Sequence, residues 1–207
     1  MNSSVPRQFH LLKGKPVIYY TINTFLAAYI DVEIILVLPE EYISTGEEII
    51  NTFFNSTRIR ITAGGKTRFN SVKNGLQLTE EDSIIFVHDA VRCLASVDLI
   101  HRCFEEATIY GSAIPVIDCR DSVRFSTGTG SEALDRTGIK LVQTPQTFRG
   151  SLLVPAFCMD YSDKFTDEAT VVEANGTKVH LVKGEENNIK ITHPVDLLVA
   201  EYLLSQH

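Results

Sequence analysis

An aspartate and an arginine follow a short, wholly apolar run near the middle of the chain. Residues 84–87 (Ile-Ile-Phe-Val) predict a strand buried on both faces, and Asp89 stands just after it. Ligands of open α/β sheets bind outside the carboxyl ends of the strands, where a carboxylate can hold a hard cation such as Mg²⁺. Arg92 is close enough to face the same anionic ligand. A turn capped by Asp89 and paired with Arg92 explains the spacing equally well.

A second candidate is a Gly-Gly turn that opens a predicted helix. Gly64 and Gly65 let the backbone approach a ligand closely, and a helix N-terminus presents free N–H groups to an anion. Lys66, Arg68 and Ser71 follow on the first turns. The spacing matches neither the P-loop nor the dinucleotide fingerprint. Taken alone, these residues fit an ordinary strand–helix turn better than a nucleotide site.

Other polar residues have simple explanations by themselves. Lys190, between Ile189 and Ile191, is typical of an edge strand that carries a charge for solubility. Arg136 is typical of a solvated surface, and Thr144, which precedes a proline, of a turn. The six histidines have no metal-ligand spacing, and the sequence has no Ser or Cys nucleophile elbow. Covalent catalysis therefore has no support.

Composition limits the classes of protein that need to be considered. The chain has 207 residues, of which 44% are apolar, and we expect a single globular domain over 1–207. The net charge of −7 leaves no basic surface for nucleic acid. No apolar run approaches the roughly 18 residues that span a bilayer, and no secretory leader is recognisable. The four cysteines lack Cys-x-x-Cys spacing, which argues against zinc and disulfides and favours a reducing cytoplasm.

Alternating strands and helices must position the candidate residues. Apolar periodicity predicts βαβ units and a mostly parallel sheet, the α/β class. The predicted strands cover 33–38, 58–62, 83–88, 111–117 and 178–182. The predicted helices cover 16–29, 40–54, 97–109, 150–160, 167–175 and 194–204, with one more after the Gly-Gly turn that ends near 75–77. Thr192 is the expected N-cap of the last helix.

Residues 118–144 interrupt this alternation. Strand-like segments at 121–125 and 139–143 flank a Ser/Thr/Gly-rich tip at 126–131, which predicts a long hairpin arm. An isolated hairpin buries too little surface to be stable in water. We therefore expect the arm to pack against a second copy of the chain in a two-fold dimer. A loose surface insertion is the alternative.

The order of these motifs carries more information than any one of them. They run Gly64-Gly65-x-x-Arg68-x-x-Ser71-Val72, Val87-His88-Asp89-Ala90-x-Arg92, Gln143-Thr144-Pro145-Gln146-x-Phe148, Thr166-Asp167-Glu168-Ala169 and Asn188-Ile189-Lys190-Ile191-Thr192-x-Pro194-x-Asp196-Leu197. Pro6-Arg7-Gln8-Phe9 and Gly14-Lys15-Pro16-Val17 extend the series towards the N-terminus. The set closely resembles the 2-C-methyl-D-erythritol 4-phosphate cytidylyltransferases of the non-mevalonate isoprenoid pathway, over essentially the whole chain.

The resemblance implies a Rossmann-like nucleotidyltransferase fold whose β-arm builds a homodimer. The implied reaction is in-line attack of the substrate phosphate on the α-phosphorus of CTP, which expels pyrophosphate. The implied nucleotide-binding residues are Gly65, Lys66, Arg68 and Ser71 around the cytosine and Ala90 at the ribose; Asp89 would hold Mg²⁺ and the triphosphate. Arg7 and Lys190 would be catalytic. The methylerythritol phosphate would be bound by Arg92 and Thr144, together with Ser122 of the partner subunit and Arg136 of the partner subunit.

Three departures from the family pattern qualify this expectation. Arg7 stands where the family usually has Lys, and Ser122 where it usually has Thr. Family members begin with a buried strand and a Gly-rich triphosphate loop, and Met1 aligns with the Met that closes this loop. We therefore expect the chain as given to lack that strand and loop, to bind CTP poorly and to have a destabilised sheet.

Two other functions stay open on the sequence alone. Ribitol 5-phosphate cytidylyltransferases share the fold and most of the motifs, although residues 166–169 look more like the methylerythritol enzymes. A non-catalytic dimeric nucleotide-binding protein is the alternative from another class. Pyrophosphate release distinguishes the binding protein from both enzymes, and the acceptor distinguishes the enzymes from each other.

Overall fold

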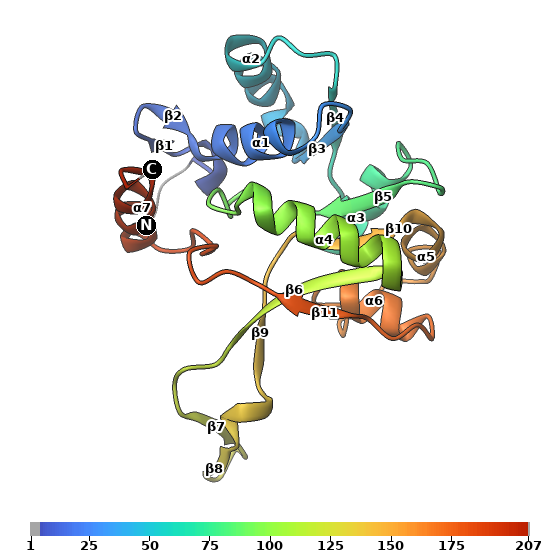
Figure 1. Ribbon diagram of the computed structural model, residues 1–207, viewed down its shortest axis with the longest axis vertical. Helices are drawn as coiled ribbons and strands as arrows, with labels where there is room; N and C mark the ends of the chain where they lie inside the picture. The colour runs from blue at the N-terminus through green and yellow to red at the C-terminus, as the bar shows by residue number, and fades with distance from the viewer. Residues whose placement is uncertain (1–4, 207) are drawn as a thin grey trace.

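The computed structural model describes residues 5–206 and shows an α/β fold built around a central sheet (Figure 1). The strand order is β11 (Leu181–Lys183), β6 (Ser112–Asp118), β10 (Gln146–Arg149) and β5 (Ile84–Val87). β10 runs antiparallel to both of its neighbours, so β5 and β6 point the same way, and β11 is parallel to β6. The predicted α/β fold with a mostly parallel sheet is confirmed, and β10 is a strand that the sequence did not predict.

A separate two-stranded parallel sheet carries the Gly-Gly turn. Strand β3 (Ile34–Leu38) pairs with β4 (Ile59–Ala63), in a register that runs from Ile34 opposite Ile59 to Leu38 opposite Ala63. Near the N-terminus, β1 (Leu11–Leu12) and β2 (Lys15–Pro16) form a short antiparallel pair. The bounds of β3 and β4 agree with the predicted strands at 33–38 and 58–62 to within one residue.

The helices lie close to their predicted positions. They are α1 (Val17–Ala28), α2 (Ile43–Phe53), α3 (Arg68–Leu76), α4 (Val97–Tyr110), α5 (Gly150–Ala156), α6 (Glu168–Ala174) and α7 (Pro194–Leu204), with 3₁₀ turns η1 (Arg7–Phe9), η2 (Glu40–Tyr42) and η3 (Arg136–Gly138). Thr67 caps α3 and Ser96 caps α4 through side-chain oxygens that accept backbone N–H groups. Gly111 ends α4 with a φ of 87°, a conformation that suits glycine.

The start of α7 differs from the prediction. His193, not Thr192, is its N-cap residue. The Asp196 carboxylate instead accepts the backbone N–H groups of Thr192 at 2.7 Å and of His193 at 2.6 Å. A carboxylate three residues inside a helix can reach back to these donors, so Thr192 need not cap the helix itself.

The core lies on both faces of the central sheet. One apolar cluster joins β10, β6, α5 and α6 through Phe148, Ile114, Leu153 and Val171. On the opposite face, α4 packs against β6 and β11 around Ala113. A separate cluster packs α1 and the 3₁₀ turn η1 against β3, outside the central sheet. Phe148 is completely buried, and truncating it to alanine is expected to cost about 3–5 kcal/mol of stability. This packing makes the strand ends a rigid support for the site.

The arm is a hairpin, but its strands pair differently from the prediction. β7 (Val123–Ser126) pairs with β8 (Ser131–Leu134), and β9 (Lys140–Val142) pairs with β6 at the base of the arm. The predicted pairing of 121–125 with 139–143 is therefore wrong. The turn after Ser126 closes at once, and residues 131–134 (Ser-Glu-Ala-Leu) carry too little β-branched or aromatic character to reveal a strand. The arm projects away from the body (Figure 1).

Candidate active site at the end of strand β5

The site is centred on Asp89, two residues after β5 ends at Val87. Its carboxylate is 3.0 Å from Lys190 Nζ, 3.5 Å from Arg92 Nε and 3.6 Å from Arg68 Nη2. The cations come from the loop after β11, the turn after β5 and the first residue of α3. We call these four residues the Asp89 cluster. The predicted metal, catalytic and substrate residues Asp89, Lys190 and Arg92 are thus brought together, and Arg68 joins them.

The surroundings of Asp89 keep it ionised. The Asp89 side chain is only 16% exposed, and burial by itself raises the pKa of a carboxyl group. The neighbouring charges, first Lys190 and then Arg68, outweigh burial and hold the pKa of Asp89 below its ordinary value. The carboxylate therefore keeps its charge across the physiological pH range.

His88 and Thr144 fix the backbone beneath this cluster. His88 Nε2 lies 3.1 Å from the carbonyl oxygen of Arg92, which can only accept, so Nε2 carries the proton. The other nitrogen, Nδ1, then accepts from the Thr144 hydroxyl at 3.0 Å. The same hydroxyl oxygen accepts the Asp89 N–H at 3.0 Å. Burial lowers the pKa of His88 to about 4, so the ring is neutral and this direction of bonding holds.

A buried amide pair joins the loop of Lys190 to the strand ends. Gln143 donates to the carbonyl of Glu185 at 2.7 Å, and Asn188 donates to the carbonyl of Thr144 at 2.8 Å. Arg92 in turn donates from Nη1 to the carbonyl of Asn188 at 2.8 Å. Residues 188–191 are irregular backbone, so these bonds rather than a sheet ladder place Lys190. The edge-strand interpretation of Lys190 is therefore wrong.

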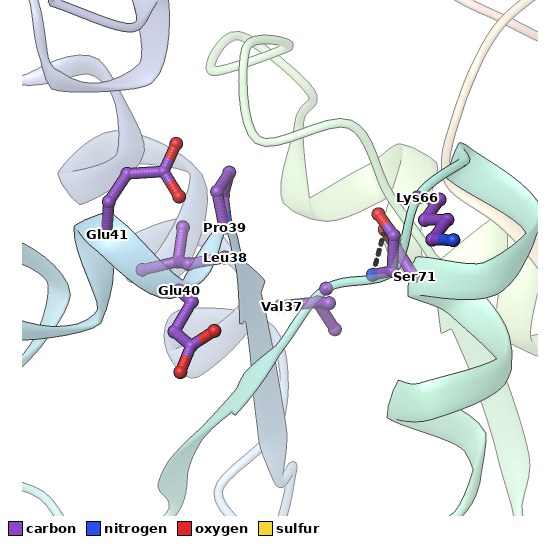
Figure 2. Close-up of a pocket in the computed structure, with 9 residues that line it drawn as sticks. Val37, Leu38, Pro39, Glu40, Glu41, Lys66 and Ser71 are labelled. Atoms are coloured by element: carbon purple, nitrogen blue, oxygen red, sulfur yellow. Dashed lines mark hydrogen bonds between the residues drawn. The ribbon is translucent and has the colours of Figure 1, made fainter.

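The Gly-Gly turn forms one wall of a pocket of about 390 Å³ between β3 and α3. Figure 2 shows Glu40 and Glu41 on the β3 side of this pocket, and Lys66 and Ser71 on the α3 side. Ser71 Oγ accepts the N–H of Gly65 at 3.0 Å and holds the turn against the helix. A Cβ on Gly65 would lie 2.4 Å from the Cβ of Asn70, so this turn requires glycine.

Arg68 reaches away from the Gly-Gly turn. Its guanidinium forms a bidentate pair with Glu168, the first residue of α6, with Nη2 at 2.9 Å from Oε2 and Nη1 bonded to Oε1. Burial opposes the charge of Arg68, but Glu168 outweighs it and raises the pKa of Arg68. Burial raises the pKa of Glu168, and the charge of Arg68 opposes that rise. Arg68 therefore lies between Glu168 and Asp89.

Four more predicted site residues belong neither to the Asp89 cluster and the groups beneath it nor to the pocket wall. Ala90 follows Asp89, and its carbonyl oxygen accepts from the Thr21 hydroxyl at 2.8 Å. Arg7 is exposed on η1, and no contact joins it to the cluster in the part of the chain that the structure describes. Ser122 and Arg136 are exposed on the arm, where Arg136 Nη1 donates to the carbonyl of Arg120. Within a single chain the arm meets the cluster at its base, where Arg92 Nη2 donates to the carbonyl of Val142 at 3.4 Å.

Sequence reasoning did not find the residues that support the cluster. The sequence motifs contain Glu168, His88, Gln143 and Asn188, but no role was predicted for any of them. The pattern Asp167-x-x-Thr170 signals a helix start, and both side chains do form a capping box. Nothing in that pattern shows that the intervening glutamate is buried, because a glutamate in the first turn of a helix is usually exposed.

The fold and site together define a class. A mostly parallel sheet with helices, a glycine turn beside a pocket, and a carboxylate with three cations at a strand end are the features of a Rossmann-like nucleotidyltransferase. The family model for 2-C-methyl-D-erythritol 4-phosphate cytidylyltransferase matches residues 1–206. The chain therefore belongs to this family.

Individual relatives agree with the family match. The chain is 45% identical to the 2-C-methyl-D-erythritol 4-phosphate cytidylyltransferase of Bacteroides fragilis over 204 residues, which cover 99% of this chain and 93% of that protein. The corresponding protein of Phocaeicola vulgatus is 44% identical with the same coverage. The crystal structure of the Thermus thermophilus enzyme superposes with a TM-score of 0.79 at 31% identity, covering 98% of this chain and 96% of that one.

A further solved structure, of a 4-diphosphocytidyl-2C-methyl-D-erythritol synthase, gives a TM-score of 0.84 at 28% identity, covering 95% and 94% of the two chains. These matches confirm the predicted activity class: a nucleotidyltransferase that carries out CTP-dependent cytidylyl transfer in isoprenoid biosynthesis. Among residues 5–206, no helix is both long and apolar enough to cross a membrane.

Proposed function

We propose that this chain transfers the cytidylyl group of CTP specifically to 2-C-methyl-D-erythritol 4-phosphate, and that the Asp89 cluster is its reacting centre. The observation that carries this proposal is the convergence of Lys190, Arg92 and Arg68 on one carboxylate. The net charge of the chain is −7, so binding two anionic substrates requires positive charge to be concentrated locally. The cluster supplies that concentration at the edge of the sheet where α/β ligands bind.

The chemistry needs positioning and charge rather than a covalent intermediate. A phosphate oxygen of the acceptor attacks the α-phosphorus of CTP, the bond from the α-phosphorus to the bridging oxygen breaks, and pyrophosphate leaves with that electron pair. Lys190 carries a mobile point charge that can move from Asp89 to the α-phosphate as negative charge grows there. Arg7, on η1, is proposed to meet the triphosphate as a second catalytic cation.

The donor set at Asp89 fits Mg²⁺ as the cofactor. In the part of the chain that the structure describes, no group of three or more His, Cys, Asp or Glu side chains could hold a metal. Mg²⁺ commonly binds through one or two carboxylates, with substrate phosphates and waters completing the octahedron. Asp89 can supply that one carboxylate. A bound Mg²⁺ would neutralise charge on the triphosphate and the leaving pyrophosphate.

The pocket beside the Gly-Gly turn is the proposed cytosine site. Gly65 brings backbone into the pocket wall, and Lys66 and Ser71 line its α3 side. Ala90 follows Asp89 directly, so its backbone is proposed to meet the ribose between the base and the triphosphate. The guanidinium of Arg68 points to Glu168 and Asp89, which favours a place at the phosphate end rather than around the base.

The acceptor is proposed to bind on the other side of Asp89, between two chains. Arg92 offers a charge there, and the buried Thr144 orients the backbone of Asp89. Arg136 of the partner subunit and Ser122 of the partner subunit would complete the phosphate site in a homodimer. The exposed apolar side chains on and below the arm, Phe125, Leu134, Leu141 and Val142, support such an interface. Four free cysteines support residence in the reducing cytoplasm.

Pyrophosphate release from CTP tests the proposal directly. The assay compares 2-C-methyl-D-erythritol 4-phosphate with ribitol 5-phosphate at equal concentrations, with Mg²⁺ and with a chelator. We expect Mg²⁺-dependent turnover with methylerythritol phosphate alone. Turnover with ribitol 5-phosphate alone would show that this compound, and not 2-C-methyl-D-erythritol 4-phosphate, is the acceptor. Turnover that survives chelation would overturn the role given to Mg²⁺ and Asp89.

A further inference from the structure

Glu168 carries a charge that the transfer reaction does not itself require. It is the first residue of α6 and is completely buried. A buried carboxylate is costly unless it is paired and hydrogen-bonded. Its partner is Arg68, whose two terminal nitrogens bind the two oxygens of Glu168. The Arg68 side chain is itself 40% exposed, so the buried partner fixes the exposed one.

Arg68 has a second carboxylate within reach. Its Nη2 atom lies 2.9 Å from Glu168 Oε2 and 3.6 Å from Asp89 Oδ1. Guanidinium and carboxylate groups bind most strongly as bidentate pairs. Glu168 holds that bidentate position, and Asp89 receives only a longer contact. Without the charge on Glu168, the same fork could close on Asp89.

We propose that Glu168 is a positioning residue that holds Arg68 off Asp89, and so leaves the Asp89 carboxylate available to a divalent cation. This inference rests on the proposed function, because the cation accompanies the nucleotide. Lys190 and Arg92 both contact Oδ2 of Asp89, and Oδ1 faces Arg68 at 3.6 Å. A bidentate arginine on the same carboxylate would cover the oxygens that the cation needs, and its charge would repel the cation.

Glu168 is anchored firmly enough for this task. The Gln146 side chain, from β10, donates to Asp167 Oδ2 at 2.9 Å and accepts the N–H of Ala169 at 2.8 Å. The Asp167 carboxylate accepts the N–H of Thr170 at 2.9 Å. The first turn of α6 is therefore tied to the strand next to β5. Asp89 follows β5 directly, and the first turn of α6 is bonded to the neighbouring strand β10, so both carboxylates that compete for Arg68 are held by adjacent strands.

The experiment compares Glu168→Gln with Glu173→Gln, which removes an exposed carboxylate from the same helix. Dissociation constants for CTP are measured by calorimetry with Mn²⁺ and with a chelator. We expect Glu168→Gln to weaken Mn²⁺–CTP binding about tenfold, because Arg68 would then block the cation from Asp89. Metal-free CTP binding should weaken much less. Glu173→Gln should match the wild type. Thermal unfolding of each variant shows whether it is folded.

A double-mutant cycle shows whether Glu168 acts through Arg68. If it does, adding Glu168→Gln to Arg68→Ala should change the Mn²⁺–CTP constant by less than about twofold. Equal weakening with and without metal, or an undiminished effect in the Arg68→Ala background, would overturn the proposal. Both outcomes would make Glu168 a structural residue that merely joins α3 to α6.

Side-chain NMR of Arg68 tests the role of Glu168 without nucleotide, and so independently of the proposed function. Absence of Mn²⁺–CTP binding by the wild-type chain would count against the function. The Arg68 Nη–H signals of the nucleotide-free protein would still decide the role of Glu168. We expect hindered guanidinium rotation in the wild type and in Glu173→Gln, and free rotation or a new pairing in Glu168→Gln. Identical signals in all three proteins would overturn the positioning role.

Discussion

The Asp89 cluster and the arm use the same kinds of side chain in opposite surroundings. In the cluster, the carboxylate of Asp89 is 16% exposed and faces Lys190 at 3.0 Å. In the arm, Lys140 and Asp118 also form an ion pair, but the side chain of Asp118 is 80% exposed. The cluster rests on buried hydrogen-bonded groups such as Thr144. The arm is exposed along nearly its whole length.

The difference separates what one chain can do from what requires two. Exposed ion pairs are screened by water and contribute little, whereas pairs on a buried, hydrogen-bonded frame hold their geometry. The cluster is therefore a finished charge arrangement within one chain. The arm presents apolar surface, with Phe125 59% exposed and Leu141 46% exposed, that the chain does not cover. We infer that the arm gains its function only against a second surface.

The largest expected effect tests the cluster alone. Lys190→Ala removes the mobile cation nearest Asp89 and should lower kcat by about 100-fold or more, because stabilisation of charge in the transition state is lost. Thermal stability should fall only modestly, because Arg68 and Arg92 still face the Asp89 carboxylate and the Lys190 side chain is 45% exposed. Lys164→Ala, at an exposed position beyond α5, is the matched control and should keep wild-type turnover. Normal turnover by Lys190→Ala would show that Lys190 has no role in the reaction.

The next effect tests whether the arm of one chain serves the site of another. Arg136→Ala should raise KM for the acceptor and lower kcat/KM by about 10- to 100-fold, the cost of a lost charged hydrogen bond. A mixture of Arg136→Ala and Lys190→Ala chains can form hybrid dimers. One site of each hybrid would combine an intact body with an intact arm from its partner.

Recovered activity in that mixture is the decisive measurement. Random exchange in equal proportions makes half of the dimers hybrids with one intact site of two, so we expect about a quarter of wild-type activity. Each variant alone should stay nearly inactive. Mass spectrometry shows whether the chains have exchanged. If they have, and the mixture is no more active than the two variants measured separately, Arg136 does not act in the partner's site and the shared site is wrong.

The sequence predicted the elements that follow local rules. Apolar periodicity located β3, β5 and all of the helices, and the Gly-Gly turn before α3 was found because glycine is required there. Strand β10 was missed because Gln146 and Thr147 are polar residues that become buried only through pairing with β5 and β6. The pairing in the arm failed for the same reason: strand partners are set by tertiary structure.

The site residues also divide into those that local motifs reveal and those that depend on tertiary contacts. Asp89, Arg92 and Lys190 could be named because their motifs resemble a family, and the structure brings them together. Glu168 and His88 could not be named, because their roles depend on burial and on hydrogen-bond partners distant in the chain. Thr144 was predicted to bind substrate, yet its hydroxyl donates to His88 and accepts from Asp89. No local pattern encodes such contacts.

Thr144 offers a test that distinguishes support of the cluster from substrate binding. Thr144→Val keeps the shape but leaves the Asp89 N–H and the His88 Nδ1 without their partner. We expect it to lower the free energy of unfolding by about 1–3 kcal/mol, the cost of buried groups left unpaired. Thr144→Ser, which keeps the hydroxyl, should lose less. Denaturant titration measures both. Full stability of Thr144→Val with a raised KM for the acceptor would instead favour direct binding.

The smallest expected effect compares the pH response of the two regions. The charges around Asp89 hold its pKa below the ordinary value, so the ionised form favours the folded state. Its contribution to stability should be fully present above about pH 4, the ordinary carboxyl range. It should disappear as the pH falls through the lowered pKa. The measurement is the difference in unfolding free energy between wild type and Asp89→Asn, from pH 7 downwards.

Asp118→Asn provides the matched carboxylate in the arm. The hydrogen bond and charge of Lys140 also lower the pKa of Asp118, so the sign of its pH dependence is the same. Asp118 is surrounded by water, however, and its pair is screened, so the difference from wild type should be smaller at every pH and should shrink further in high salt. If the arm carboxylate showed the larger pH-dependent term, burial would not be what distinguishes the two regions. The arm would then have to be ordered by its own charges rather than by a partner surface.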